Sequence, residues 1–326
     1  MKSGFVAILG EPNVGKSTLL NAILNEKVSI VSPKPQTTRN KILGIYNDDD
    51  GQIVFIDTPG IHKAKNKLDE YMSKAINTAK TDVDAILYVI DATKKITDKT
   101  IENLNKYSQN ANVILVVNKM DDTTYEKIYP ELTKCNSLSS IKDIVPVSAK
   151  KSKNLDELIK VIKSYLHEDV KYFDDDIYTD QSIKQMVAEI IREKALWLLQ
   201  DELPHGIAIE IARFDENNPI TEIDADIILE KASHKSIVIG KNGSMLKNIG
   251  TKARQDIEKL LGAQVMLKLF VKVREDWRNS TSTVKSLGYN SDNLWLYFCV
   301  VIYINNMVII LWARCSVAYI RHWEYL

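Results

Sequence analysis

Cysteine is scarce in this 326-residue sequence, which contains only Cys135, Cys299 and Cys315. Their odd number and wide spacing argue against a disulfide framework and against a zinc site, and they favour a reducing compartment. Net charge is also lacking, because 43 basic residues balance 43 acidic ones, so total charge indicates no partner. The opening residues MKSGFVAILG hold an apolar run too short for a secretory signal, with no cleavage site after it. We therefore expect a mature start and a cytoplasmic protein.

Apolar runs alternate with helical patterns along the first half of the chain. The runs, each ending in polar or glycine-containing residues, are 4–10, 51–60, 85–93, 112–121 and 143–149, and helical spacing is found at 17–24, 67–80 and 154–166. The alternation predicts an α/β domain with a mostly parallel sheet and helices on both faces. Sheets of this class bind ligands beyond the carboxyl ends of their strands, so the polar segments should converge.

The alternation stops in the acidic stretch HEDVKYFDDDIYTD, which we interpret as a linker. The length of the chain suits two domains, each able to bury its own core. We predict a first domain over residues 1–172, a linker over 173–180, a second domain over 181–285 and an extension over 286–326.

The segment GEPNVGKS fits the pattern G-x-x-x-x-G-K-[ST] between a predicted strand and a predicted helix. Such a loop folds its backbone N–H groups around phosphate oxygens, and the start of the helix adds a partial positive charge. Lys16 supplies charge toward the β- and γ-phosphates, and Ser17 presents a hydroxyl group to Mg²⁺. The alternative is a chance match in an ordinary glycine turn. The predicted phosphate-binding residues are Gly10, Glu11, Pro12, Asn13, Val14, Gly15, Lys16, Ser17 and Thr18.

The segment DTPG ends another predicted strand and argues against a chance match. Asp57 can reach Mg²⁺ through a coordinated water, and the N–H of Gly60 can meet a γ-phosphate. Thr58 and Pro59 complete the segment.

Two later segments point to guanine as the base. In NKMD, the Asp121 carboxylate can accept from the N1–H and the 2-amino group, a pattern that adenine cannot satisfy. Asn118 can tie the segments together, and Lys119 can lie over the base. In VSA, the Ala149 N–H can donate to guanine O6 while Ser148 braces the loop. Four such segments in this order predict a site for GTP and GDP with Mg²⁺.

The segments PNVGKSTLLN and PQTTRNKILGI together resemble the TrmE–Era–Der group of P-loop GTPases. The resemblance implies that QTTRN is the first switch segment, in which Thr38 ligates Mg²⁺ and closes over the γ-phosphate. Thr37 is the neighbouring alternative. Many GTPases carry a water-orienting glutamine directly after the glycine of DTPG, where this chain has Ile61. We therefore expect backbone groups, the Thr38 carbonyl and the Gly60 N–H, to position the attacking water.

Asn13 matches the asparagine that binds K⁺ in related proteins, where the ion replaces an arginine finger. The resemblance implies slow hydrolysis that K⁺ stimulates more than Na⁺. The catalytic candidates are thus Lys16, Thr38, Gly60 and Asn13.

The second half of the chain contains the loop Gly240-Lys241-Asn242-Gly243 between two predicted helices. A G-x-x-G loop can approach a nucleic-acid backbone closely, as it does in KH domains, although a lone match is more often a tight helix–helix turn. Here the element order is helix, strand, strand, helix, helix, strand, the order of a type II KH domain.

Charge is unevenly distributed within this second unit. Residues 180–230 hold 4 basic and 12 acidic residues, whereas residues 231–293 hold 12 basic and 5 acidic ones. The half with the loop is therefore the basic half, as RNA binding requires. Candidate RNA contacts outside the loop are Lys235, Lys247, Lys252 and Arg254, each of which could instead be a solvated helix charge.

Longer segments, among them AEIIREKALWLLQDELPHGIAIEI and SIVIGKNGSMLKNIG, resemble the Era family of bacterial GTPases over residues 3–293. The resemblance implies GTP hydrolysis and a role in assembly of the small (30S) ribosomal subunit. It also implies binding near the 3′ end of 16S rRNA under control of the nucleotide state, and peripheral association with the inner membrane. We expect a monomer. The rival functions are a GTP-regulated RNA chaperone with negligible hydrolysis and a tail-anchored membrane GTPase.

The extension is hydrophobic from residue 294 onward and is atypical for the family. Residues 294–313 carry no charge over 20 positions, which is long enough for a helix to span a bilayer. The alternatives are a frame-altered or read-through terminus and an extra segment that packs or stays disordered. We favour these alternatives, because length alone is a weak argument for a membrane helix.

Overall fold

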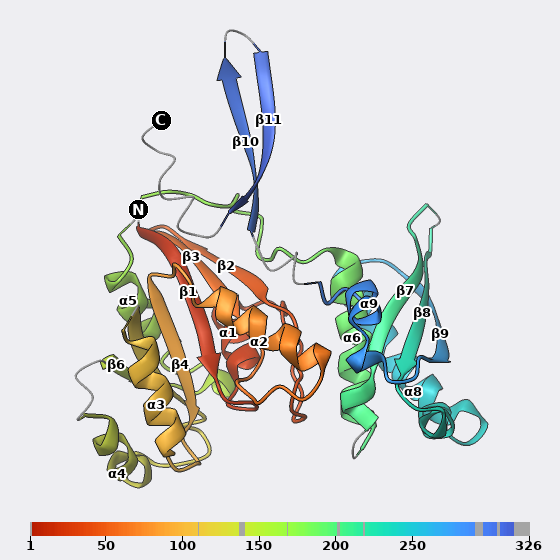
Figure 1. Cartoon of the computed structure of the whole chain (residues 1–326), viewed down its shortest axis with the longest axis horizontal. Helices are drawn as coiled ribbons and strands as arrows, with labels where there is room; N and C mark the ends of the chain where they lie inside the picture. The colour runs from red at the N-terminus through yellow and green to blue at the C-terminus, as the bar shows by residue number, and fades with distance from the viewer. Residues whose placement is uncertain are drawn as a thin grey trace.

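The computed structural model shows two domains side by side, each built on its own sheet (Figure 1). The structure describes residues 2–109, 111–136, 141–167, 169–200, 203–217, 219–290, 296–304 and 307–315.

The first sheet has six strands in the order β2-β3-β1-β4-β5-β6. Neighbouring strands are parallel except for the antiparallel pair β2 and β3, so the predicted α/β fold is confirmed. Every residue of β3 and β4 is buried, because helices cover both faces, and this burial explains why these strands are continuous apolar runs. The strands are β1 (Lys2–Gly10), β2 (Ile42–Asp48), β3 (Gly51–Asp57), β4 (Ala85–Asp91), β5 (Asn112–Asn118) and β6 (Ile141–Pro146).

Two hydrophobic cores lie on the two faces of this sheet. Helices α1 (Lys16–Leu24) and α5 (Leu155–Ser164) pack into one core. Helices α2 (Lys67–Ala79), α3 (Asp98–Tyr107) and α4 (Tyr125–Asn136) pack into the other. Helices α3 and α4 are not among the predicted elements. α3 buries only a narrow stripe, and α4 contains Pro130, which weakens a helical pattern.

Strand β2 was not predicted either, although it begins two residues after the switch segment QTTRN. Asp48 forms the turn into β3, its carboxylate accepting from the backbone N–H groups of Asp50 at 3.0 Å and Gly51 at 3.1 Å. The free edge of β2 is covered by the linker. The Ile45 N–H donates to the Tyr178 carbonyl at 3.0 Å. An edge strand that is covered in this way is protected from pairing with another chain.

The second domain has the predicted order of elements. Its sheet runs β7-β8-β9, with β7 and β8 antiparallel and β8 and β9 parallel. The first helix starts with a capping box between Ser182 and Gln185. The elements are α6 (Ile183–Leu198), β7 (Ala208–Asp215), β8 (Thr221–Leu229), α7 (Lys235–Ile239), α8 (Ser244–Leu261), β9 (Val265–Val273) and α9 (Thr281–Ser286).

A hydrophobic cluster joins the two domains, where α2 lies against α9 and the strands of the second sheet (Figure 1). Leu68 and Met72 of α2 are fully buried there. Trp277 of the second domain is also fully buried, and its ring stacks on Tyr289 with centroids 6.2 Å apart. The helix that follows DTPG therefore packs directly on the second domain.

The hydrophobic extension forms strands where it is described. β10 (Leu296–Ile304) and β11 (Met307–Cys315) pair antiparallel as a separate two-stranded sheet. A membrane-spanning helix is therefore wrong for residues 296–304 and 307–313, the described part of the span considered above, since β-branched and aromatic residues favour strands. Across the described parts of the chain, no helix combines the length and the apolar character needed to cross a membrane.

Candidate nucleotide and nucleic-acid sites

The phosphate loop connects the end of β1 to the start of α1. The Lys16 ammonium group lies inside the loop and donates to the carbonyl oxygens of Gly10 at 3.2 Å and Glu11 at 3.0 Å. Burial lowers the pKa of Lys16 to about 8, while the charges of Asp57 and Glu11 act in the opposite direction. A buried cation that donates to uncharged carbonyl oxygens is well suited to bind phosphate.

Three oxygen-bearing side chains meet beside this lysine. Ser17 Oγ lies 2.8 Å from Thr38 Oγ1 and donates to Asp57 Oδ2 at 2.7 Å. Asp57 is fully buried, which raises the pKa of its carboxyl group, and its Oδ1 atom has no hydrogen-bond partner. Hydroxyl and carboxylate oxygens are the ligands that Mg²⁺ prefers, and a bound cation would satisfy the unpartnered oxygen. Ser17, Thr38 and Asp57 therefore fit Mg²⁺, which would neutralise phosphate charge there.

The structure distinguishes the two threonines of the switch segment. Thr38 faces Ser17, whereas the Thr37 hydroxyl donates to the Lys34 carbonyl at 2.6 Å and lies 2.7 Å from the Ser32 hydroxyl. Thr38 is thus the threonine beside the metal position. A pocket is lined by the phosphate loop, the switch segment and Gly60; its residues are Pro12, Asn13, Gly15, Lys16, Ser17, Thr18, Ile30, Val31, Ser32, Gln36, Thr37, Thr38 and Gly60.

The segment after Asp57 lies against the phosphate loop. A Cβ atom added at Gly60 would lie 2.8 Å from the Cα atom of Pro12, so this close approach requires glycine. The Ile61 N–H donates to the Gly10 carbonyl at 3.1 Å, and its side chain packs on the hydrophobic core. Ile61 therefore packs on the core and does not line the nucleotide pocket. Thr58 and Pro59 are buried, and the Thr58 hydroxyl donates to a β1 carbonyl at 2.8 Å.

His62 connects the first switch segment to the second, the residues that begin with DTPG. Its Nδ1 lies 2.7 Å from the Gly60 carbonyl and its Nε2 lies 3.3 Å from the Asp69 carboxylate. The hydrogen bond to Asp69 raises the pKa of His62. Gln36 of the first switch segment donates to the same carboxylate at 2.8 Å. This histidine is not among the predicted site residues, because no local pattern indicates its contact with Asp69.

The base-binding segments meet at Asn118, which is 2% exposed at the end of β5. Its Nδ2 donates to the Val14 carbonyl of the phosphate loop at 3.0 Å. Its Oδ1 accepts from the backbone N–H groups of Lys119 at 2.8 Å and Ala149 at 3.0 Å. The Ala149 N–H that was expected to meet guanine O6 is thus bound to Asn118 in this structure. Asn118 ties all three segments together.

Two further contacts shape the base site. Ser148 Oγ donates to Asp121 Oδ1 at 2.6 Å, and this hydrogen bond lowers the pKa of Asp121. The carboxylate therefore stays ionised and can accept hydrogen bonds from the guanine base. The Lys119 ammonium donates to the Asn13 carbonyl at 2.9 Å and to Asp91 at 2.7 Å. Asp91 was not predicted as a site residue, although its position at the carboxyl end of β4 is one where such residues are expected.

The G-x-x-G loop lies between α7 and α8, with its second glycine open to solvent. Gly243 has φ +75°, and a Cβ atom added there would meet nothing within 4 Å. Asn242 also has a left-handed backbone, with φ 52°. The loop leads directly into the N-terminus of α8, an 18-residue helix whose partial positive charge favours a phosphate group. The backbone here is free to approach a phosphodiester chain.

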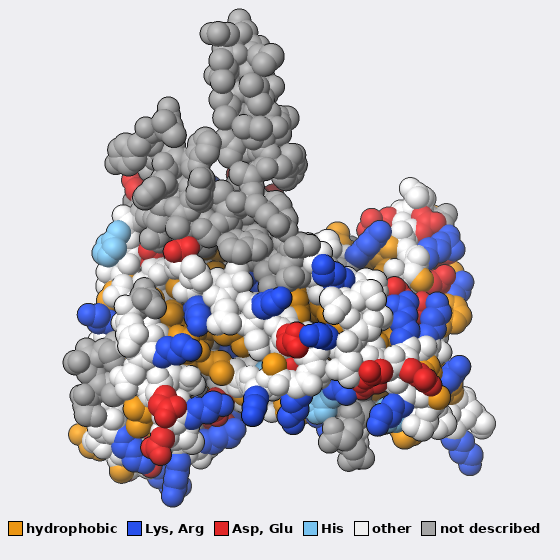
Figure 2. All heavy atoms as spheres, viewed as in Figure 1, with side chains coloured by type: hydrophobic (Ala, Val, Ile, Leu, Met, Phe, Trp, Pro, Cys, Tyr) orange, Lys and Arg blue, Asp and Glu red, His pale blue; other side chains and the backbone are white. Residues whose placement is uncertain are grey.

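A groove runs from this loop along α8 and β9. It is lined by Gly243, Leu246, Lys247, Gly250, Thr251, Arg254, Leu267 and Leu269. The side chains of Lys235, Lys241, Lys247, Lys252 and Arg254 are all exposed. Lys247 and Arg254 line the groove itself. On the face shown in Figure 2, basic and acidic side chains are interspersed over both domains, so charge is not gathered in one large patch.

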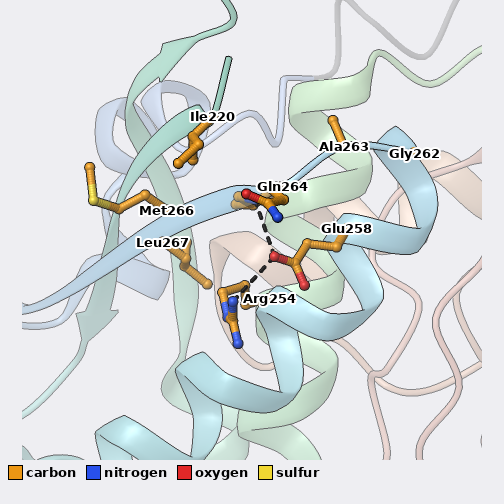
Figure 3. A pocket seen from close by; sticks show the side chains of 9 residues that line it. Ile220, Arg254, Glu258, Gly262, Ala263, Gln264, Met266 and Leu267 are labelled. Carbon is orange, nitrogen blue, oxygen red and sulfur yellow. Dashed lines mark hydrogen bonds and ion pairs between the residues drawn. The ribbon is translucent and has the colours of Figure 1, made fainter. Parts of the chain in front are cut away.

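Arg254 is already partly paired. Its Nη1 donates to Glu258 at 3.2 Å, as Figure 3 shows. Glu258 also accepts from the Val265 N–H at 3.2 Å. Arg254 also lines the neighbouring hollow drawn there, together with Gln264 and Met266. Glu258 therefore reduces the free charge of Arg254, which makes Lys241 and Lys247 the stronger candidates for phosphate contacts.

Comparisons with known proteins agree with both sites. A family model described as 50S ribosome-binding GTPase matches residues 5–119, and a KH-domain model matches residues 202–278. GTPase Era of Clostridioides difficile (strain 630) is 52% identical over 295 residues, spanning 89% of this chain and 99% of its own length. The chain belongs to the Era family of GTPases. GTPase Era of Clostridium kluyveri is 50% identical over 293 residues, with shares of 89% and 99%.

Two solved Era structures align over the same extent. One is Aquifex aeolicus Era, as a variant bound to GDP·AlF₄⁻, and the other is Era in complex with MgGDPNP and nucleotides 1506–1542 of 16S ribosomal RNA. Each is 41% identical, has a TM-score of 0.85 and covers 89% of this chain and 99% of its own. Era-family membership confirms the family resemblance and the fold, and it makes this chain a GTPase. Negligible hydrolysis, the first rival function, is not supported.

Proposed function

We propose that this Era-family GTPase binds the 3′ region of 16S rRNA through its KH domain and acts in assembly of the small ribosomal subunit. The observation that carries the proposal is the G-x-x-G loop, which is open at Gly243 and lies at the head of the α8–β9 groove in the basic half of the second domain. A solved Era structure with 41% identity holds a 16S rRNA fragment. The groove suits a short single strand, since stacking and backbone contacts need unpaired nucleotides.

Nucleotide state would control this binding through the shared interface. GTP hydrolysis changes the contacts of the switch segments, and α2 packs on the KH domain in the cluster around Trp277. A change in either switch segment therefore acts on a surface that the KH domain also uses.

The test is binding of a labelled RNA with the sequence of the 16S 3′ end. Gly243→Asp places a side chain and a negative charge in the loop, and it should weaken binding at least about tenfold. Lys241→Ala should make the negative slope of log affinity against log salt concentration less steep by about 0.7. Lys285→Ala, an exposed lysine on α9 outside the groove, is the matched control. Unchanged RNA affinity of Gly243→Asp would show that the loop is not the RNA site.

Subunit choice is tested separately by sedimentation. Protein loaded with GDPNP should co-sediment with small subunits that lack a mature 3′ end, and less with large subunits. Preference for large subunits would contradict the proposed role while leaving RNA binding by the KH domain intact.

We also propose that K⁺ assists hydrolysis at Asn13. The exposed Asn13 side chain lies at the mouth of the pocket, where its Nδ2 donates to the Pro33 carbonyl of the switch segment at 2.9 Å. An amide oxygen and a switch carbonyl together suit a monovalent cation, which would supply positive charge near the leaving phosphate. Hydrolysis should be faster in K⁺ than in Na⁺ at matched ionic strength. A K⁺ effect that persists in Asn13→Ala would contradict this role.

The proposal places the protein in the cytoplasm, with peripheral association at the inner membrane as the family resemblance implies. Cell fractionation with a carbonate wash tests this location. Protein that stays with the membrane after the wash would contradict peripheral association.

A further inference from the structure

The switch motif QTTRN belongs to a longer switch segment, residues 25–41, which lacks regular structure of its own. None of these residues, all of which the structure describes, lies in a helix or a strand. Its backbone polar groups therefore need partners other than a helix or a sheet ladder. Several of these partners are side chains of the KH domain and of the residues just before its first helix, α6.

Helix α6 binds the switch backbone at Val31 through both of its polar groups. The Glu193 carboxylate accepts from the Val31 N–H at 3.0 Å, and the Trp197 indole N–H donates to the Val31 carbonyl at 2.8 Å. Just before α6, the Gln181 side chain donates to the Val28 carbonyl at 2.6 Å. These contacts hold the first half of the switch segment against α6.

The KH domain also holds the two residues that flank Thr38. On one side, Arg192 Nη2 donates to the Thr37 carbonyl oxygen. On the other side, the Arg39 side chain enters the KH domain and donates to two of its backbone carbonyl oxygens, at 2.6 and 3.0 Å. Thr38 thus lies between two anchors on the second domain.

Both anchoring guanidinium groups are enclosed, with Arg39 1% exposed and Arg192 0% exposed. Arg39 Cζ lies 5.9 Å from the ring centroids of Trp277 and Tyr289, within the range of a cation–π contact. Arg192 is paired with Glu189, which accepts from Nε at 2.9 Å and from Nη2 at 2.5 Å. A buried charge that loses a partner is strongly destabilised, so these contacts resist movement of the switch segment away from the KH domain.

We infer that the KH domain positions Thr38 for the GTPase reaction, with Arg39 and Arg192 as positioning residues. Thr38 Oγ1 lies 2.8 Å from Ser17 Oγ, at the metal position, and the arginines act on it through the backbone on either side. Neither arginine lines the nucleotide pocket. The inference uses the GTPase activity of the family and does not depend on the ribosomal target proposed above.

The inference predicts an effect that depends on the γ-phosphate. Thr38 would close over a γ-phosphate and its metal ion, as the family resemblance implies, and GDP has no γ-phosphate. Loss of an anchor should therefore weaken binding of a GTP analogue and slow hydrolysis, while GDP binding stays nearly the same. General damage to the pocket would instead weaken both nucleotides.

The experiment compares the full chain with Arg39→Lys and Arg192→Lys, which keep the charge but lose the planar donor fork. Arg274→Lys is the matched control, because Arg274 pairs with Glu210 away from the switch segment. Affinities for GDPNP and GDP are measured with Mg²⁺, and single-turnover hydrolysis is followed at increasing Mg²⁺. Each anchor variant should lower GDPNP affinity about tenfold and GDP affinity less than about twofold. It should also need more Mg²⁺ for half-maximal hydrolysis.

Trp197→Phe provides a gentler variant, since it removes the indole N–H donor and part of a ring system on a residue that is 57% exposed. It should shift the ratio of GDPNP to GDP affinity in the same direction, by about threefold. If Arg39→Lys and Arg192→Lys leave the ratio where Arg274→Lys leaves it, or weaken both nucleotides equally, the inference is wrong. If both buried variants fail to fold by circular dichroism, the Trp197→Phe ratio decides.

Discussion

Asn118 is the residue whose removal should affect nucleotide binding most broadly. Its side chain makes one hydrogen bond to Val14 and two to the backbone N–H groups of Lys119 and Ala149. Each bond contributes about 1 kcal/mol net, so Asn118→Ala should cost about 3 kcal/mol. Since 1.4 kcal/mol corresponds to a tenfold change, nucleotide affinity should fall by about 100-fold. The loss falls on binding because the three bonds join the phosphate loop to the base-binding segments.

Dissociation of a fluorescent GDP measures this loss, and a fluorescent GTP analogue should show the same factor. Asn112→Ala is the matched control. Asn112 begins the same strand, β5, and makes a hydrogen bond to the Asp84 carbonyl at 3.0 Å, far from the nucleotide. A GDP dissociation rate of a folded Asn118→Ala protein within about threefold of the Asn112→Ala rate would refute the assigned role. Equal loss for both nucleotides also separates this residue from the switch anchors Arg39 and Arg192, whose loss should affect the GTP analogue alone.

Three further predictions concern the segment after DTPG and the domain interface. The hydrogen bond to Asp69 raises the pKa of His62. The pair therefore stabilises the fold fully below the unfolded histidine pKa of about 6.5, and this stabilisation is lost as the pH rises through the raised pKa. His62→Gln should make the melting temperature less dependent on pH between about pH 6 and 8. Gly60→Ala would place Cβ 2.8 Å from a phosphate-loop Cα atom, and the displaced backbone should slow single-turnover hydrolysis by about 100-fold, whereas an unchanged rate would contradict the close approach. Met72→Ala, at a fully buried interface position, should lower the free energy of unfolding by about 2–4 kcal/mol in urea, against little change for the exposed Lys74→Ala on the same helix.

The nucleotide site was predictable because its chemistry is local. Lys16 and Ser17 lie in one loop, and the loop pattern itself states which backbone and side-chain groups meet phosphate. Asp57 and Asn118 follow apolar runs, and parallel strands bring their carboxyl ends to one edge of the sheet. The KH loop around Gly243 was predictable for the same reason, since its glycines and the order of the neighbouring elements are read along the chain.

Which residues pair across distant segments could not be predicted. The place of Asp91 at a strand end marks it as a site residue, but its pairing with Lys119 depends on β4 and β5 being neighbours. His62 meets Asp69 only after the chain turns into α2. In the hydrophobic extension, a property that is plain in the sequence pointed to the wrong structure. Its uncharged length satisfies the requirement for a membrane helix, yet its β-branched and aromatic residues form the strands β10 and β11 where it is described.

The sequence by itself determined the chemistry of this protein: a phosphate loop, a guanine-binding set and a G-x-x-G loop, each a short pattern whose function depends on neighbouring residues. Only the tertiary structure decided how these parts work on one another. Arg39 lies in the switch motif and Arg192 in the KH domain, 153 residues apart by number, and nothing local marks either as a partner of Thr38. Their role follows from burial at a domain interface, where each charge must find its partners on the opposite surface.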